Sequence, residues 1–342
     1  MAWPRPLASL WLDASEASDG YPRLEQVWTV PDAGRIARFS PDGAHVACGS
    51  SNGTVKLIEV GPLGANSPTP ATRTFTEGTK AINDVDFDPK SRMLITASDD
   101  CTIRFFDHRS DATKSARQCT DTHPVRSVSF HAAGDHLLVG TDHPAVHLYD
   151  VATFRCYMSA QAHDHHTAPV RAVRWLGDGS MYASCAAGEV KLWDGVASRC
   201  VRTWQAAHGG HAVHHVEFCA AEGRTPTLLT AGADGSAKLW DVGSGKFVRA
   251  IGASAPAGSA PACCVAHDGR HVAAAADAAG GFALWEAHAG DLVQRVGGAP
   301  LAGAPVVLSH LAHARSAPVV AACDVHDAMT LWAAPDTEGG EA

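Results

Sequence analysis

The sequence predicts an all-β protein built as a closed, seven-bladed propeller, and three observations support this. Short runs of alternating apolar residues recur from about residue 25 to residue 333, with Gly, Pro, Asp or Asn between them. These runs follow one period, which occurs seven times. The 32 glycines and 19 prolines indicate many turns rather than long helices.

Each period contains a run whose third residue is usually aromatic, as in KLWD or RFFD. The seven residues at this anchor position are Ile58, Phe106, Tyr149, Trp193, Trp240, Trp285 and Trp332. Neighbouring anchors lie 43 to 48 residues apart, and one four-stranded WD40 blade takes about 40–45 residues. Seven anchors therefore predict seven WD40 blades.

Within a period the strands can be assigned in order. An inner strand of the form V-x-x-V-x-F comes first, and clear examples are residues 82–87, 125–130, 170–175 and 213–218. A second strand and a tight turn follow, as at Asp234-Gly235, because Asp-Gly strongly favours a hairpin. The anchor strand is third, and runs such as 154–158, 200–204 and 247–251 predict the outer strand.

The last blade lacks an outer strand in this assignment. Residues 335–342 are few and contain Pro335 and Glu338, whereas residues 25–30 are strand-like and unassigned. We therefore expect the N-terminal strand to close the ring, which removes a long exposed sheet edge. The predicted organisation is an N-terminal extension (1–24), a seven-bladed propeller (25–334) and a C-terminal tail (335–342).

The fifth blade carries the four polar residues of the WD40 structural tetrad. They are His208, Thr230, Asp234 and Trp240. A buried indole N–H needs an acceptor, and an imidazole can join an aspartate to a hydroxyl. The position six residues before the anchor is not a comparable Asp in most other blades, so we expect only the fifth blade to keep a complete tetrad.

Composition narrows the possible functions. The net charge of −9 argues against an extensive phosphate-binding surface. The ten cysteines form no C-x-x-C pair and lie mostly in apolar runs, which is typical of a reducing, intracellular setting. The sequence contains neither an apolar run long enough to span a membrane nor a nucleophile elbow, Walker loop or dinucleotide-binding motif. We expect no enzymatic activity and no cofactor.

Two histidine-rich stretches raise the possibility of a metal site. The histidines are His163, His165, His166, His208, His211, His214 and His215. Imidazole is a good zinc ligand, but neither stretch has a recognised zinc-ligand spacing and both fall between blades. We expect no functional metal from these stretches.

A polar ring is predicted where the inner strands begin, and we call it the entry rim. Asn83, Arg126, Arg171 and His214 each follow the first apolar residue of an inner strand, and Asp142 and His143 lie in a neighbouring turn. Arg is common among binding hot spots, so these residues are candidates for contacting a protein partner. The alternative interpretation is that they are ordinary solvated surface residues.

Several stretches resemble a narrower group, the WD40-repeat subunit (subunit 1) of the cleavage stimulation factor, which acts in mRNA 3′-end formation. They include RIARFSPDG (35–43), TIRFFDHRS (102–110), the segment 126–156 with its VGTDHP turn, and KLWDGVASRC (191–200). Members of this family carry an N-terminal dimerisation domain, but only 24 residues precede Glu25 here. We therefore expect this chain to lack that domain.

The resemblance implies a non-enzymatic nuclear scaffold in polyadenylation. Its partners would be a helical-repeat bridging subunit and an RNA-binding subunit, with RNA contacted mainly through them. The alternative is a WD40 adaptor of another complex, such as a substrate receptor of a ubiquitin ligase, because a fold does not dictate a function.

Overall fold

The protein is described here from a computed structural model. The structure describes residues 21–61, 70–90, 92–159, 161–251, 261–276, 281–297 and 307–334. Most of the expected N-terminal extension and all of the expected C-terminal tail lie outside these residues. Among the described residues, no helix has the length and apolar character needed to cross a membrane.

The described strands form seven antiparallel sheets of four strands each, as the anchor spacing predicts. Blades one to three contain β2 (Ile36–Phe39), β3 (His45–Gly49), β4 (Val55–Glu59), β5 (Thr72–Phe75), β6 (Ile82–Phe87), β7 (Met93–Ser98), β8 (Thr102–Asp107), β9 (Arg117–Thr120), β10 (Val125–Phe130), β11 (His136–Thr141), β12 (His147–Asp150) and β13 (Cys156–Tyr157). Blades four to six contain β14 (Ala172–Trp175), β15 (Met181–Cys185), β16 (Val190–Asp194), β17 (Cys200–Trp204), β18 (Val213–Cys219), β19 (Thr227–Gly232), β20 (Ala237–Asp241), β21 (Phe247–Ile251), β22 (Cys263–Val265), β23 (His271–Ala275), β24 (Phe282–Glu286) and β25 (Leu292–Val296).

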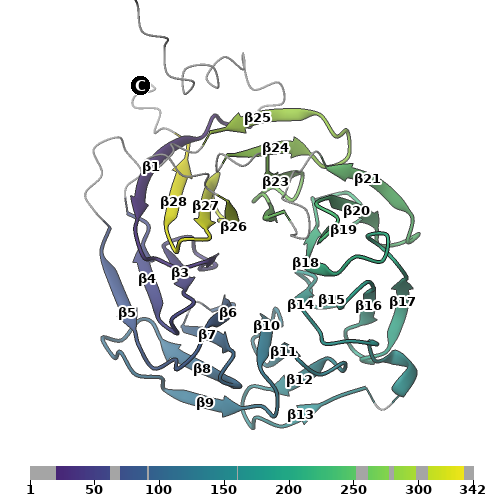
Figure 1. The fold of residues 1–342 in the computed structure, drawn as a ribbon, viewed down its shortest axis with the longest axis horizontal. Coiled ribbons are helices and arrows are strands. Elements are labelled where there is room, and N and C mark those ends of the chain that lie inside the picture. Colours follow the sequence, from purple (N-terminus) through teal and green to yellow (C-terminus); the bar gives the residue numbers. More distant parts are fainter. Residues whose placement is uncertain are drawn as a thin grey trace, which may run out of the picture.

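Blade seven joins the two ends of the described chain. It contains β26 (Leu308–His313), β27 (Val319–Asp324), β28 (Met329–Ala333) and the N-terminal strand β1 (Glu25–Val30). Strand β1 pairs antiparallel with β28, and Glu25 lies opposite Ala333 (Figure 1). The predicted closure by the N-terminal strand is confirmed.

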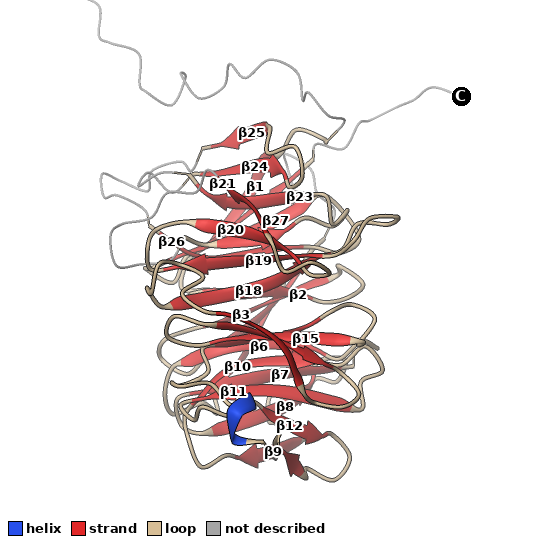
Figure 2. Cartoon of the chain, turned by 90° about the vertical axis from the view of Figure 1, so that its right-hand side faces the viewer, coloured by secondary structure: helices blue, strands red, loops and turns tan. Residues whose placement is uncertain are grey.

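The inner strands of the seven blades surround the axis of the ring, which we call the central channel; residues of all seven blades line a cavity at one end of it. The inner strands of neighbouring blades pack against one another all the way round, including β26 against β2 (Figure 1). Apolar side chains fill the space between blades; Phe105 of blade two, for example, shares a buried cluster with Phe130 and Tyr149 of blade three. Figure 2 shows the ring from its edge, with the 3-10 turn η2 (Ala162–Asp164) in the loop before β14.

Two strand predictions are too long. The outer strand of blade three is only β13, because Phe154 has a left-handed backbone with φ of 56° and ends the preceding turn. The inner strand of blade four begins at Ala172 rather than residue 170, although the Arg171 N–H still bonds to Cys185 O. At Asp234-Gly235 the predicted hairpin turn is present, and Gly235 takes φ of 79°.

Candidate protein-interaction site

β-Bulges position three of the expected entry-rim residues. The pairing of the inner strand with its neighbour shifts after the first residue of β6, β10 and β18. The extra residue at each shift is Asn83, Arg126 or His214. A bulge leaves one residue outside the ladder and redirects its side chain, which explains why these polar residues follow a buried apolar one without entering the core.

Hydrogen bonds join the entry rim of blade two to that of blade three. Asn83 Nδ2 donates to Asp99 Oδ1 and to Val125 O, both at 2.8 Å. Arg126 Nη1 donates to the same Asp99 oxygen at 2.6 Å. Its Nε and Nη2 donate to the two carboxylate oxygens of Asp142 at 2.8 and 2.6 Å. This bidentate pair holds the guanidinium of Arg126 in place.

The entry rim continues into blades four and five without such direct bonds. The pKa of Asp142 is lowered first by its bond from Arg126 and then by the charges of Arg126 and Arg171. Partial desolvation lowers the pKa of His214, and the Arg171 charge lowers it further. Arg171 therefore acts electrostatically on both neighbours, and its side chain is exposed. It presents a cation that a partner can reach.

The ring of His143 does not extend this arrangement. Its Nδ1 accepts the Ala145 N–H at 3.1 Å within the turn. The ring lies near those of His123 and His147, with centroids 5.3 and 5.5 Å away. The structure thus joins Asn83, Arg126 and Asp142, places Arg171 and His214 beside them, and turns His143 towards other histidines.

Sequence reasoning missed Arg35 of blade one. The Arg35 N–H bonds to Gly49 O at the end of β3, just as the Arg171 N–H bonds to Cys185 O at the end of β15. The two arginines therefore hold equivalent backbone positions, and Arg35 is exposed. The signal lay in RIARFS (35–40), which aligns with the inner-strand pattern of the other blades.

A second set of charged side chains crosses the central channel. Arg174 Nη1 donates to Asp84 Oδ2 at 2.8 Å, and Arg38 Nη2 lies 3.7 Å from Asp84 Oδ1. Ser127 Oγ donates to the same carboxylate at 2.8 Å. Burial alone would raise the pKa of Asp84, but Arg174 and Arg38 lower it to about 2. These bonds span blades one to four and support the ring from inside.

The channel widens into a cavity of about 460 Å³ where the inner strands end. Both aromatic and charged side chains line its wall, including Arg38, Asp86, Trp175, Glu217 and Arg315. Positive and negative groups are thus mixed. The cavity lies at the end of the channel opposite the entry rim.

The fifth blade contains the expected hydrogen-bonded tetrad. His208 Nδ1 donates to Asp234 Oδ1 at 2.8 Å, and its Nε2 accepts from Thr230 Oγ1 at 2.8 Å. Trp240 Nε1 donates to the same Thr230 oxygen at 3.0 Å. Burial lowers the pKa of His208 despite its Asp234 partner, which favours a neutral imidazole. His208 is fully buried, so these groups support the fold rather than face a substrate.

The expectation that only the fifth blade keeps a tetrad is wrong. In blade four, His166 Nδ1 bonds to Glu189 Oε1 at 2.9 Å and its Nε2 bonds to Ser184 Oγ at 2.6 Å. Trp193 Nε1 donates to the same Ser184 oxygen at 2.8 Å. Glu189 is closer to its anchor in sequence than Asp234 is, and its longer side chain spans the difference.

The histidine-rich stretches do not converge on one point. His166 and His208 belong to tetrads, and His165 Nε2 bonds to Ser159 O at 2.8 Å. His211 Nδ1 contacts His208 O at 3.1 Å, and His215 lies 3.5 Å from Glu217. These five rings each have a local partner of their own, and within the part of the chain that the structure describes neither stretch forms a cluster of facing ligands.

A closed seven-bladed ring with hydrogen-bonded tetrads in two blades defines a WD40 β-propeller, a class of proteins that typically act as non-catalytic scaffolds and adaptors. Residues 25–222 match a β-propeller family described as "Nucleolar protein 10-like, N-terminal domain". This match covers more than half of the chain, which therefore belongs to that family.

Comparison with curated proteins finds WD40 relatives of several kinds. The chain is 41% identical over 192 residues to "Cleavage stimulation factor subunit 50" of Arabidopsis thaliana, covering 54% of this chain and 45% of that protein. It is 25% identical over 210 residues to mouse "Target of rapamycin complex subunit LST8", covering 59% and 61% of the two chains. It is 23% identical over 216 residues to the Arabidopsis "Transcriptional corepressor LEUNIG_HOMOLOG", covering 63% and 25%. The matches thus span less than two thirds of each relative.

Proposed function

We propose that this chain is a non-enzymatic scaffold subunit of the nuclear machinery that cleaves and polyadenylates pre-mRNA. The observation that carries the proposal is the 41% identity to "Cleavage stimulation factor subunit 50", compared with 23–29% to the other relatives found. Its partners are a helical-repeat bridging subunit and an RNA-binding subunit. The net charge of −9 supports RNA contact through those partners rather than through this chain.

The entry rim is the proposed docking site for the bridging subunit. Arg171 supplies an exposed cation, while Arg126 is held by Asp99 and Asp142 and so shapes the surface. A fixed polar surface that carries an exposed arginine suits a protein partner that offers a carboxylate. Asn83, Asp142, His143 and His214 would form the surroundings of that contact.

The test is direct binding between purified proteins, with Arg171→Glu as the variant. Charge reversal should weaken binding of the bridging subunit about tenfold or more, and poly(A)-site cleavage in extract depleted of the native protein should fall in parallel. Arg270→Glu is the matched control, because Arg270 is an exposed arginine in the turn before β23, away from the entry rim. It should bind as the wild type does.

Two results would count against the proposal, and they separate its parts. Wild-type binding by a folded Arg171→Glu variant would show that the bridging subunit docks elsewhere on the propeller. Failure of the wild-type chain to bind the bridging subunit, together with capture of cullin-type ligase subunits, would instead favour the ubiquitin-ligase adaptor.

A further inference from the structure

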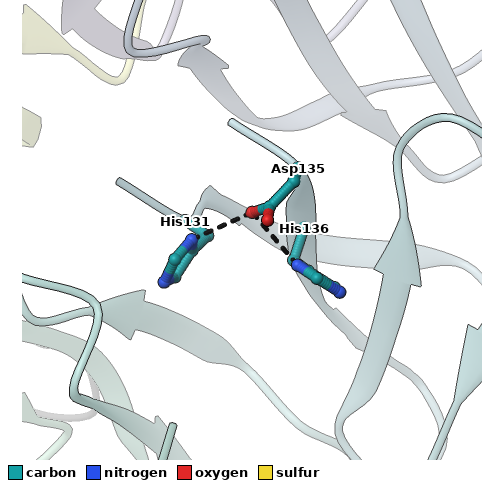
Figure 3. A group of neighbouring side chains, drawn as sticks. All are labelled: His131, Asp135 and His136. Atoms are coloured by element: carbon teal, nitrogen blue, oxygen red, sulfur yellow. Dashed lines mark hydrogen bonds and ion pairs between the residues drawn. The ribbon is translucent and has the colours of Figure 1, made fainter. Parts of the chain in front are cut away.

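Three potential metal ligands meet in the turn between β10 and β11. His131 follows β10, Asp135 precedes β11, and His136 is the first residue of β11. Their ligand atoms all lie within 4.8 Å of one another (Figure 3). They belong to neither of the histidine-rich stretches noted in the sequence.

The geometry brings both imidazoles onto one carboxylate oxygen. Asp135 Oδ1 lies 3.0 Å from His131 Nδ1 and 3.0 Å from His136 Nδ1 (Figure 3). Around a tetrahedral zinc ion with bonds of about 2.0–2.1 Å, neighbouring ligand atoms are about 3.3 Å apart. Small movements of these side chains would therefore place all three atoms at bonding distance from one ion.

The turn holds the ligands on a rigid backbone. The His131 N–H bonds to His136 O at 2.9 Å and the Gly134 N–H to His131 O at 2.8 Å, so both histidines flank a closed hairpin. The His131 ring packs edge-on against Trp175, with centroids 4.8 Å apart. At Gly179 a side-chain carbon would overlap His131 Nε2, so the glycine leaves room for this ring. A ligand fixed in this way loses little freedom on binding a metal.

We propose that His131, Asp135 and His136 bind a divalent transition metal ion, zinc being the best match to two imidazoles and one carboxylate. A ring nitrogen that binds the ion carries no proton, so both neutral imidazoles would hold their proton on Nε2 and offer the Nδ1 lone pair to the metal. The ion would replace the contacts of the two Nδ1 atoms with Asp135, and the longer 3.3 Å contact from the Ala133 N–H to His131 Nδ1. Water completes the coordination, because Asp135 and His136 are exposed at the surface, with 57% and 38% of their side chains accessible.

The ion would act as a structural cross-link rather than a catalyst. Phe130 and Ala132, next to His131, line the cavity at the end of the channel. An ion bound to this turn would restrict the movement of the two cavity-lining residues Phe130 and Ala132. The assignment is independent of the proposed role in mRNA processing.

Blade one offers a matched control turn. Its Ser40 N–H bonds to His45 O and its Gly43 N–H to Ser40 O, both at 2.9 Å, in the same pattern as blade three. In this turn Ser40 and Ala44 replace His131 and Asp135, and only the last histidine is kept, as His45. His45→Gln therefore removes an equivalent histidine without touching the proposed ligands.

The test uses the full chain, stripped of metal by chelation and titrated with Co²⁺ as a visible probe. Wild type and His45→Gln should bind one Co²⁺ with the intense d–d absorption of a tetrahedral site, and Zn²⁺ should displace it. His136→Gln and Asp135→Asn should lose this absorption and bind at least about tenfold more weakly.

Both ligand variants alter partly exposed side chains, and circular dichroism checks that they fold. If one of them misfolds, the other decides the result. Absence of the tetrahedral absorption in wild type would overturn the proposal. So would retention of wild-type absorption and affinity in a folded ligand variant, because the ion would then be bound by other histidines.

Discussion

In each tetrad the indole N–H of the anchor tryptophan holds in place the hydroxyl group that hydrogen-bonds to the histidine. Trp193 Nε1 and Trp240 Nε1 each donate to an oxygen that also bonds to an imidazole. The two anchors differ in burial. Trp193 is only 1% exposed and stacks on Tyr182 at a centroid distance of 5.5 Å and an angle of 7°, whereas Trp240 is partly exposed. Trp193 therefore combines a hydrogen bond with complete burial.

This difference predicts the cost of removing each indole. Trp193→Ala should lower the free energy of unfolding by about 3–5 kcal/mol, as expected for a fully buried tryptophan, and Trp240→Ala should cost less. Val196→Ala is the control, since Val196 is 94% exposed. Denaturant unfolding measures all three, and equal midpoints for Trp193→Ala and Val196→Ala would contradict the anchor role.

Replacing Arg126 or Arg171 of the entry rim should change the free energy of unfolding by different amounts. Arg126→Gln breaks bonds to Asp99 and Asp142 and leaves two carboxylates without their cation, so it should cost about 1–2 kcal/mol after allowing for solvent screening. Arg171→Gln should stay within about 0.5 kcal/mol of wild type. Chemical denaturation distinguishes them; a cost for Arg171→Gln equal to that for Arg126→Gln would show that both are structural.

The inner strands show which structural features a local sequence pattern can predict and which it cannot. The V-x-x-V-x-F pattern located β6 and β10 and identified Asn83 and Arg126 as a shared column. It did not reveal the bulges that redirect them, because a bulge is defined by pairing with the neighbouring strand. The pairing of Arg126 with Asp99 in another blade is likewise a long-range contact that the pattern of one strand does not contain.

The anchor strands show a different limit of prediction from sequence. Residue type and spacing predicted seven blades, the closing strand and the tetrad of blade five. They missed the tetrad of blade four, because a search for an acid at one fixed position does not detect Glu189, whose longer side chain reaches His166 from another position. They also predicted an outer strand in blade three that is longer than β13. The reason is that an apolar residue such as Phe154 gives no sign in the sequence of its left-handed backbone conformation.

Strand β1 should be essential for the integrity of blade seven. Removing residues 1–30 deletes β1 and leaves β28 with an unpaired edge, so we expect a lower melting temperature and aggregation. Removing residues 1–20 keeps β1 and the buried residues Tyr21 and Leu24, and should be mild. Melting temperature and soluble yield provide the measurement. Identical values for the two truncations would mean that β28 does not need this partner.

The channel as a whole couples folding to proton binding. Burial and the nearby Arg38 lower the pKa of His310 to about 3, although its ring is partly accessible within the channel. Burial also lowers the pKa of His313 to about 4. Below about pH 6.5 an unfolded chain protonates these rings while the folded chain does not, so stability falls with acidification. The lowered pKa of Asp84 affects the free energy of unfolding only below about pH 4, where an aspartate in the unfolded chain takes up a proton.

The free energy of unfolding should therefore fall from about pH 7 to about pH 5. Each of these two histidines contributes a slope of about 1.4 kcal/mol per pH unit below its unfolded pKa. His310→Asn should reduce the total slope by about that amount while keeping an acceptor for the Ala37 N–H. Denaturant titrations at several pH values test this; an unchanged slope would mean that His310 takes up no proton on unfolding.

The pairing of Glu25 with Ala333 also determines when, during synthesis, strand β1 can pair with β28. At about 5–20 residues per second, a ribosome needs roughly 15 to 60 s after making β1 before it has made β28. During that interval β1 is a free edge with no partner yet synthesised. Within the described propeller, the strand that is made first is thus among the last to be paired, and it is a target for chaperones that shield β edges.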